Sequence, residues 1–566
     1  MASVPVVVKH QGKKYEVEVD ATSNGETFKF QLYSLTGVEP ERQKILVKGG
    51  QLKDDADMSK LGLKPNQQIM MMGTPSGDTS RVIEKPKEKV KFLEDMTEAE
   101  QAQAEGATPA GLQNLGNTCY MNSTLQALNN AGPSSSSQLS QYGLGGLGAS
   151  MDLTASLRDL FKQMSQTQQG FPPLMFLNAL RTAFPQFAQK SKDGQGYAQQ
   201  DAEEAWSQIV SQLRQKLTIK DSAAQSEDNK TKDISFVDKF MSGAFDSVME
   251  CDEPAAKDGG EEPVNSEDKF FKLDCHINAE TNHLRDGLMS GLQEKIEKRS
   301  EILGRDAVYT KTSRISRLPK YLPVHFVRFD WRKTTGKKAK IMRKVTFPQE
   351  LDAVEYCTED LKKALIPIRD KIREIRKAEE DVERARKRQK RTRVEEAASV
   401  EKSVRSDEPL QKKAEKKKST AKNASEDTEM EDVEYKTDAQ IEAERAATIL
   451  EAKKELLALV KTDLSSDEGA NHTGLYELRG IITHQGISAD SGHYTSFVKK
   501  LGSKDPATGK RKEEDGKWWW FNDDKVSEVD TERIETLYGG GQSHSALLLL
   551  YRAVPLATVE EEDKQA

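Results

Sequence analysis

Four short stretches of the first 73 residues have the apolar pattern of strands. Residues 4–10 and 13–20 read as two strands at hairpin distance, because every second position is apolar and a Gln-Gly pair separates them. A hairpin-like stretch covers 44–52, and 69–72 is a last short apolar strand. The pattern predicts a small unit that is rich in strands.

One stretch of this unit changes its period. Over 25–37, Phe28, Leu32 and Leu35 recur at i, i+4 and i+7, which predicts a helix with these side chains on its buried face. Gly37 follows, as is typical of a helix C-terminus. The order strand, strand, helix, strand, strand therefore predicts a compact α+β domain.

The rest of the chain differs from this unit in composition. Residues 75–105 are polar and charged and are predicted to be a linker, whereas 106–553 are globular with interruptions. The largest interruption, about 370–440, has helical composition but almost no apolar face, so we expect an exposed, partly disordered insertion. Residues 440–464 carry enough Ile and Leu to pack as a helix, and 554–566 form an acidic tail.

Composition narrows the class of protein. The chain has 85 basic and 92 acidic residues and a net charge of −7, which does not indicate a nucleic-acid partner. It contains no run of about 18 apolar residues and no signal-peptide profile, so we expect neither a membrane span nor secretion. The thiols should therefore be reduced.

Each cysteine could be a buried structural thiol, a metal ligand, half of a disulfide or a nucleophile. They are scattered and form no Cys-x-x-Cys pair, so we expect no zinc site, no other metal or cofactor, and no disulfide. The four residues are Cys119, Cys251, Cys275 and Cys357.

Cys119 lies in GLQNLGNTCYMNSTLQAL, residues 111–128. Met121, Leu125 and Leu128 follow it at i, i+4, i+7 spacing, which predicts a helix with one apolar face. Cys119 would then stand at the N-terminus of that helix, where backbone N–H groups and the helix dipole favour a thiolate. This position alone is weak evidence, since buried cysteines also begin helices by chance.

A second stretch supplies the partners of a nucleophile. Residues 476–500 read as two strands around a Gly- and Ser-rich turn, with His493 after Gly492 at the start of the second strand. Asn522 and Asp523 follow a dense aromatic strand and could orient the imidazole from an adjacent strand. Together with Cys119 they give nucleophile, base and orienter.

Asn114 lies five residues before Cys119, on the turn into the helix. Its amide and the backbone N–H of Cys119 can both donate to a developing oxyanion. Asn114 is therefore the candidate oxyanion donor.

These stretches resemble the cysteine and histidine boxes of the ubiquitin-specific proteases (peptidase family C19), a family of thiol hydrolases. GYAQQDAEEAWSQIV, FFKLDCHI, LPKYLPVHFVRFDW and KVTFPQELD match intermediate landmarks in order, so the resemblance spans about 106–553. It implies a papain-like fold of palm, thumb and fingers, with the Cys119 helix in the thumb and the His493 strand in the palm. Many members hold a zinc in the fingers. This chain lacks those cysteines, so we expect its fingers to hold together by packing alone.

The resemblance also implies roles for single residues. Cys119 is the nucleophile, His493 the general base and Asn522 the third triad member, with Asp523 as support. Asp201 is similar to the family aspartate that meets an arginine in ubiquitin's C-terminal tail. The residues expected to contact the substrate are Gln200, Asp201, Gly492 and Tyr494.

Residues 1–74 resemble ubiquitin, most closely in TGVEPERQKILVKGGQL. Gly73-Thr74-Pro75 replaces the free Gly-Gly end, so this β-grasp module cannot be conjugated and is expected to dock. The combination is similar to the proteasome-associated deubiquitinase subfamily. It implies a ubiquitin-recycling enzyme in cytoplasm and nucleus, bound to the regulatory particle of the 26S proteasome and monomeric when free. Loops near 330–343 and 487–492 would cover the active-site groove.

Two other functions stay open at this level. The chain could be a non-catalytic ubiquitin receptor or scaffold on the proteasome, or a redox-sensing thiol protein. The intact set of candidate catalytic residues argues against the first, and the later boxes argue against the second. The basic run at 384–393 fits a nuclear-import signal or, as we favour, a solvated charged helix.

Overall fold

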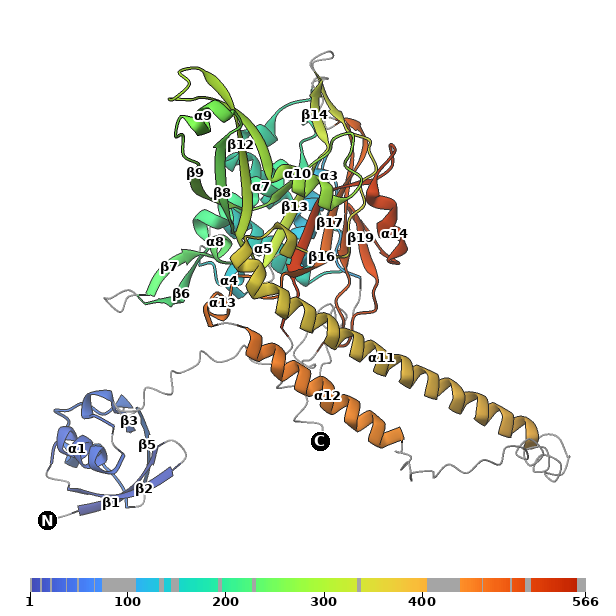
Figure 1. Cartoon of the computed structure of the whole chain (residues 1–566). Coiled ribbons are helices and arrows are strands. Elements are labelled where there is room, and N and C mark those ends of the chain that lie inside the picture. The colour runs from blue at the N-terminus through green and yellow to red at the C-terminus, as the bar shows by residue number, and fades with distance from the viewer. Residues whose placement is uncertain are drawn as a thin grey trace. The chain divides into compact units, whose positions relative to one another are not determined.

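The computed structural model describes residues 3–73 and 108–556 (Figure 1). Gaps in these ranges lie at 11–12, 21–22, 37, 48–49, 66, 132–136, 144–151, 192–195, 226–230, 333–336, 405–437, 461, 489–490 and 504–510. The linker predicted at 75–105 and most of the acidic tail lie outside the described residues. The chain divides into two compact units, Met1–Asp95 and Met96–Ala566.

The first unit is a five-stranded sheet with one helix on it. The strand order is β2-β1-β5-β3-β4, with β1 antiparallel to β2 and parallel to β5. Alternation explains the core, because Val17 and Val19 of β2 are buried between exposed charged neighbours. The predicted strands are confirmed. Their bounds are β1 Ser3–His10, β2 Lys13–Asp20, β3 Lys44–Val47, β4 Gly50–Gln51 and β5 Gln67–Met72.

The predicted helix is α1, Gly25–Thr36. Phe28 and Leu32 are buried against the sheet, as predicted, but Leu35 is 49% exposed. The expectation for Leu35 was wrong, because the core of this unit includes Phe28 and Leu32 but not Leu35.

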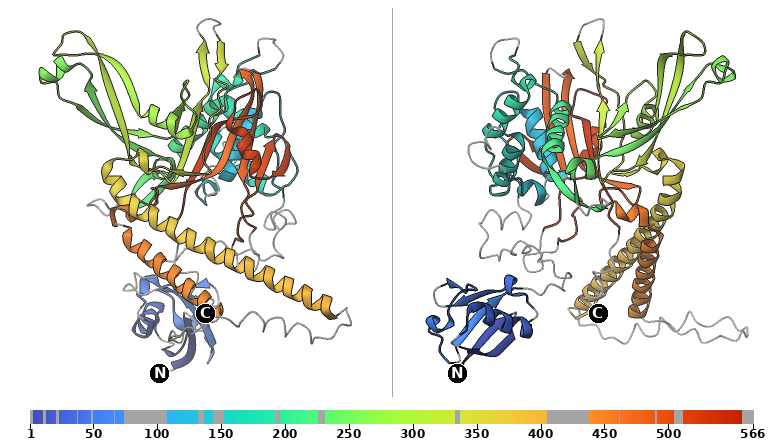
Figure 2. Two further views of the ribbon diagram at one scale, coloured as in Figure 1. Left: turned by 45° about the vertical axis from the view of Figure 1, so that its right-hand side comes forward. Right: turned by 90° about the vertical axis from the view of Figure 1, so that its left-hand side faces the viewer.

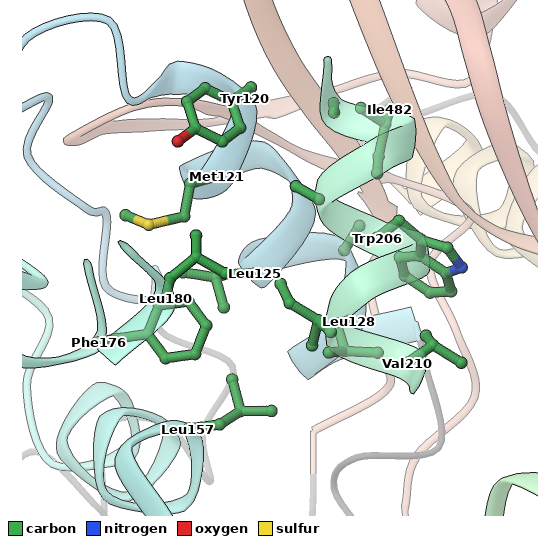
Figure 3. Packing of buried hydrophobic residues seen from close by; sticks show 14 of the residues in the cluster. Tyr120, Met121, Leu125, Leu128, Leu157, Phe176, Leu180, Trp206, Val210 and Ile482 are labelled. Carbon is green, nitrogen blue, oxygen red and sulfur yellow. The ribbon is translucent and has the colours of Figure 1, made fainter. Parts of the chain in front are cut away.

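The thumb of the second unit consists of packed helices. α3 is surrounded on all sides, so even its polar side chains Asn122, Ser123 and Thr124 are buried. Met121, Leu125 and Leu128 lie on its apolar face, as predicted, and meet Leu157, Phe176 and Trp206 of neighbouring helices (Figure 3). The helices are α3 Cys119–Ala131, α4 Ser137–Ser140, α5 Leu153–Ser165, α6 Leu174–Ala183 and α7 Ala202–Lys216.

The palm is an eight-stranded sheet that carries the histidine box. Its order is β10-β13-β21-β17-β18-β19-β20, with β16 paired to β17. Gly480 of β17 lets α3 approach closely, because a Cβ there would lie 2.7 Å from the Cβ of Ala131. The strands are β10 Leu273–His276, β13 Tyr321–Val327, β16 Glu350–Asp352, β17 Leu475–Ser488, β18 Ser491–Lys499, β19 Trp518–Asn522, β20 Lys525–Val529 and β21 Ser545–Ala553.

The fingers are a four-stranded sheet, β11-β12-β8-β9, that projects from the palm (Figure 2). Packing alone does not hold the tip, contrary to our expectation. Beside a small cluster around Cys251, Glu261 accepts hydrogen bonds from Ser300 Oγ (2.6 Å) and Tyr309 Oη. The strands are β8 Gly243–Cys251, β9 Val264–Phe270, β11 Gln293–Arg299 and β12 Asp306–Arg317, with α9 Pro254–Asp258 at the tip.

The remaining elements are short. Two-stranded pairs form from β6 Thr218–Gln225 with β7 Thr231–Ser235, and from β14 Phe329–Arg332 with β15 Lys337–Lys340. The short helices are α8 Phe236–Phe240, α10 Leu284–Gly291, α13 Thr462–Ser466 and α14 Glu532–Glu535. No helix in the described ranges is both long and apolar enough to cross a membrane.

The insertion begins as a 46-residue helix, α11 (Glu359–Val404), with α12 (Asp438–Leu459) alongside. The prediction that 370–440 buries nothing was wrong in its first turns. Ile372 and Ile375 continue a stripe from Ile368 and are buried against Leu456 of α12. The stripe has only three residues, and the other faces of α11 are strongly charged. The composition of the segment therefore does not reveal the stripe. The packing predicted for 440–464 is confirmed.

Candidate active site

Cys119 is the first residue of α3 and is only 3% exposed. Residues 111–118 lead into it through Asn117, whose φ is +55°. Asn adopts this left-handed conformation more readily than most residues. The amide of Asn117 donates to the carbonyl of Tyr197 at 3.0 Å, which ties the turn before the nucleophile to the segment before α7.

The thiol is in its protonated form at rest. Burial raises the pKa of Cys119 to about 11, since desolvation and the charge of Asp523 outweigh hydrogen bonds from the backbone of Tyr494, Tyr120 and Cys119. The backbone N–H groups at the helix N-terminus do favour the thiolate, as expected, but burial outweighs them. A dipole effect is small beside the cost of burying a charge.

His493 is the third residue of β18, and its side chain is 32% exposed. Its Nε2 lies 2.6 Å from Oδ1 of Asn522, the last residue of β19. An amide oxygen only accepts hydrogen bonds, so Nε2 carries the proton and Nδ1 is the basic nitrogen. Within the described part of the chain, no hydrogen bond joins His493 to Cys119. The base is therefore oriented, but it does not yet hold the proton of the thiol.

Asp523 occupies the next position, with φ +52°. Its Oδ2 is 4.0 Å from His493 Nε2 and accepts from Asn114 Nδ2 at 3.0 Å, while its Oδ1 accepts from Asn122 Nδ2 at 2.8 Å. The backbone N–H of Leu112 donates to its carbonyl at 3.0 Å. Asp523 thus holds Asn114 and Asn122, which lie before and after Cys119 in the chain. Its charge can stabilise a protonated His493.

Asn114 is held in one orientation. Its Oδ1 accepts from the backbone N–H groups of Gly116 (3.0 Å) and Thr118 (3.2 Å), so its Nδ2 faces Asp523. An amide nitrogen has two hydrogens, and one of them is left to donate to an oxyanion. The role of oxyanion donor stays a prediction for Asn114.

Gly492 and Tyr494 flank the histidine differently. Gly492 has φ +129°, and a Cβ there would lie 2.1 Å from the carbonyl oxygen of Gln485, so only glycine fits. Gly492 is exposed, whereas the Tyr494 ring is fully buried against His484 with centroids 4.7 Å apart. The expectation that the Tyr494 side chain contacts substrate does not fit this placement, because strand alternation turns the ring into the core.

Gln200 and Asp201 lie at the start of α7. Gln200 is half-buried, and Asp201 caps the helix, with Oδ1 accepting from the backbone N–H of Glu203 at 2.9 Å. α7 packs against α3, and Thr124 Oγ1 donates to the carbonyl of Ala202 at 3.2 Å. The predicted substrate residues are therefore fixed to the helix of the nucleophile.

The two predicted gates are neighbouring hairpins. β14 pairs with β15, and β17 with β18, and their tips at 333–336 and 489–490 lie outside the described residues. The buried Lys340 joins them, because its Nζ donates to the carbonyl of His484 at 2.6 Å. Burial, helped by the charge of Arg328, lowers the pKa of Lys340 to about 8.

Sequence reasoning missed Asn122 and Lys340. Asn122 is a polar residue one turn after Cys119 in a helix buried on all sides, and such a side chain needs a specific partner. That pattern is visible in the sequence, but the partner, Asp523, is not. Among the described residues, no group of three or more His, Cys, Asp or Glu side chains is arranged to hold a metal ion.

A buried thiol at a helix N-terminus, an oriented imidazole and a fixed amide donor define a papain-like cysteine hydrolase. Comparison with known proteins identifies its family. Residues 110–551 match the family model described as ubiquitin carboxyl-terminal hydrolase, and residues 6–76 match the ubiquitin family. The chain therefore belongs to the ubiquitin carboxyl-terminal hydrolase family, as a cysteine-type ubiquitinyl hydrolase that binds ubiquitin as substrate and carries an N-terminal ubiquitin-like domain.

Whole-length relatives have the same organisation. Ubiquitin carboxyl-terminal hydrolase 6 of Schizosaccharomyces pombe is 42% identical over 98% of this chain and 100% of its own length. Ubiquitin carboxyl-terminal hydrolase 7 of Arabidopsis thaliana is 37% identical over 97% and 98%. Ubiquitin carboxyl-terminal hydrolase 14 of Caenorhabditis elegans is 30% identical over 97% and 94%.

Proposed function

We propose that this deubiquitinase acts on conjugates bound to the proteasome, with its ubiquitin-like domain as the docking module. The observation that carries the proposal is a ubiquitin fold that lacks the Gly-Gly end needed for conjugation and precedes a complete protease domain. A module that cannot be conjugated but is fused to an enzyme contributes by raising local concentration. We propose that the enzyme, through this association, acts in cytoplasm and nucleus.

The surface of the ubiquitin-like domain supports a docking role. Leu46 of β3 pairs in register with Met70 of β5, and both are exposed, by 46% and 54%, on the sheet face away from α1. Met72 adds a third exposed apolar side chain (48%) on β5. Contiguous apolar side chains on a small domain are typical of a protein-binding surface.

The proposed reaction is acyl transfer in two steps. His493 Nδ1 takes the proton of Cys119 as the sulfur attacks the carbonyl carbon of ubiquitin's last glycine, and the oxygen is stabilised by Asn114 and the backbone N–H of Cys119. His493 then protonates the leaving lysine amine, and water hydrolyses the thioester. Gln200 and Asp201 hold the ubiquitin tail, and Gly492 leaves space for it beside His493. Because no hydrogen bond joins His493 to Cys119 among the described residues, we propose that the free enzyme is slow until substrate and proteasome align the site.

A single surface substitution tests docking. Met70→Glu should abolish co-purification with proteasomes and the stimulation of hydrolysis by added proteasome, without changing hydrolysis by the free enzyme. The matched control is Phe30→Glu on α1, where the native side chain is also 54% exposed. Proteasome binding that survives Met70→Glu and a deletion of residues 1–75 would place docking in the catalytic domain and overturn the proposal.

A further inference from the structure

A chain of polar contacts crosses from the thumb to the palm. Glu203 Oε1 of α7 accepts from Lys272 Nζ at 2.7 Å and from Ser207 Oγ at 2.7 Å. Lys272 Nζ is also 3.3 Å from Asp274 Oδ1 of β10, and that oxygen lies 2.8 Å from His325 Nδ1 of β13. One lysine therefore connects a thumb helix with two palm strands.

Lys272 also lies where the fingers join the palm. It is one of the two residues between the end of β9 at Phe270 and the start of β10 at Leu273. The other, Phe271, lies under the guanidinium of Arg214 in the last turn of α7, 4.5 Å from its ring centroid. Both ends of α7 thus contact the short connection from fingers to palm.

The ion pair is substantially buried, so it constrains the helix more than a surface pair does. The side chains of Lys272 and Glu203 are 30% and 18% exposed. Burial alone raises the pKa of Glu203, but the charge of His325 and hydrogen bonds from Lys272 and Ser207 leave it below the usual value. Removing the lysine would leave a carboxylate in this site without its main partner.

Glu203 belongs to the same helical turn as the proposed tail-binding residues. Its backbone N–H donates to Asp201 Oδ1 at 2.9 Å, and its side chain is anchored by Lys272. The position and direction of the first turn of α7 therefore depend in part on a contact with the connection from fingers to palm. A shift of this turn would move Gln200 and Asp201 together.

We propose that Lys272 is a positioning residue for ubiquitin recognition. Through Glu203 it fixes the first turn of α7 against the palm, so that Gln200 and Asp201 meet the ubiquitin tail. This inference rests on the tail-binding role given to these residues under the proposed function. In this proposal, the connection between fingers and palm positions the residues that bind the ubiquitin tail.

The test compares steady-state kinetics on ubiquitin with a fluorophore at its C-terminus. We expect Lys272→Met to raise KM about tenfold, equivalent to about 1.4 kcal/mol, with kcat changed less than about twofold. Lys272→Arg should restore KM, because the guanidinium reaches the same carboxylates. The rate of Cys119 alkylation should stay unchanged, since α3 itself is not displaced.

A matched control is available in the fingers. Lys311 pairs with Asp268 at 2.8 Å, and its side chain is 28% exposed, close to the values for Lys272. Lys311→Met removes an ion pair of similar length that does not touch α7 and whose carboxylate is more exposed (48% against 18%), so its KM should stay at the native value. An equal rise of KM in Lys311→Met, or an unchanged KM in Lys272→Met, would overturn the inference.

Further variants separate the two proposals and guard against misfolding. Asp201→Ala tests tail binding by itself: an unchanged KM there sinks the tail-binding role, whatever Lys272→Met does. Raised KM in Asp201→Ala with native KM in Lys272→Met sinks only the positioning role. If Lys272→Met does not fold, Glu203→Gln and Lys272→Arg carry the measurement. Glu203→Gln and Lys272→Met together should raise KM no more than either alone, because they act through one contact.

Discussion

The two sides of the active site are built in opposite ways. Cys119 belongs to a helix buried on every side, whereas His493 lies on an exposed strand end beside a glycine. The nucleophile side is held by the apolar core of the thumb, and the histidine side by single hydrogen bonds such as Nε2 to Asn522 at 2.6 Å. On the nucleophile side, burial raises the pKa of the Cys119 thiol and so favours its protonated form. The more exposed side carries the imidazole of His493, which must take the proton of the thiol.

Asp523 is where the two sides meet. It follows Asn522 in the chain, yet its carboxylate binds Asn114 and Asn122 on the nucleophile side. Its contribution is therefore to alignment across the groove as well as to charge. The support of the imidazole that we expected from Asp523 stays a prediction, with its Oδ2 4.0 Å from His493 Nε2.

The largest effect should come from removing the nucleophile. Cys119→Ala should abolish hydrolysis of a fluorogenic ubiquitin substrate while leaving ubiquitin affinity within about twofold, because the sulfur is the reacting atom and Cys119, only 3% exposed, offers little surface to bound ubiquitin. Loss of a triad member typically costs several orders of magnitude in rate. Cys357→Ala, another fully buried cysteine, is the control and should retain activity. Residual turnover near the native rate in Cys119→Ala would remove this residue from its role.

On the histidine side, Asn522→Ala should lose less rate than His493→Ala, because Asp523 Oδ2 is already 4.0 Å from Nε2 and can take over part of the orientation. Asp523→Ala should lower kcat about 10²-fold by releasing Asn114, with KM nearly native. The double variant measures how far the two residues substitute for each other. Complete loss in Asn522→Ala alone would show that Asp523 does not help to orient the base.

Crowding at Gly492 gives a smaller loss. Gly492→Ala should reduce kcat/KM about tenfold or more, because the new Cβ clashes with Gln485 and displaces the strand that carries His493. Gly516→Ala is the control, since its φ is also positive (+76°) but nothing lies within 4 Å of a Cβ. Equal losses in both variants would mean that backbone strain, and not the position of His493, lowers the activity.

The protonation state of the thiol can be measured without substrate. With a pKa near 11, the thiolate fraction of Cys119 is small at neutral pH and rises as pH increases. The alkylation rate of Cys119 by iodoacetamide should therefore grow about tenfold per pH unit up to about pH 9 without a plateau. A plateau below pH 8 would show a thiolate that is already paired with His493 in the free enzyme.

The smallest effect on activity should come from the insertion. Ile372→Ala opens a cavity in the stripe between α11 and α12 and should lower the free energy of unfolding by about 2–5 kcal/mol. Hydrolysis per folded molecule should stay native, because the stripe touches none of the candidate catalytic residues. A drop in kcat without a drop in thermal stability would connect the insertion to the active site.

The local sequence pattern was sufficient to predict a helix or strand wherever one face of that element packs against a single core. The i, i+4, i+7 spacing of Met121, Leu125 and Leu128 predicted the face that α3 buries, and alternation predicted β1, β2 and β5. The residue types around Cys119 and His493 were enough to name candidates for nucleophile, base, orienter and oxyanion donor. Each of these inferences needs only neighbours in the chain, because helix and strand periods fix which side chains share a face.

Tertiary structure decided what depends on distant neighbours. Leu35 is exposed, Tyr494 is buried and the Cys119 thiol is protonated because of elements that pack from elsewhere in the chain. Asp523 meets Asn114 and Asn122 across separations of 409 and 401 residues, and Lys272 meets Glu203 across 69. Periodicity carries no information on such pairs, since desolvation and hydrogen bonding depend on which surfaces the fold brings together.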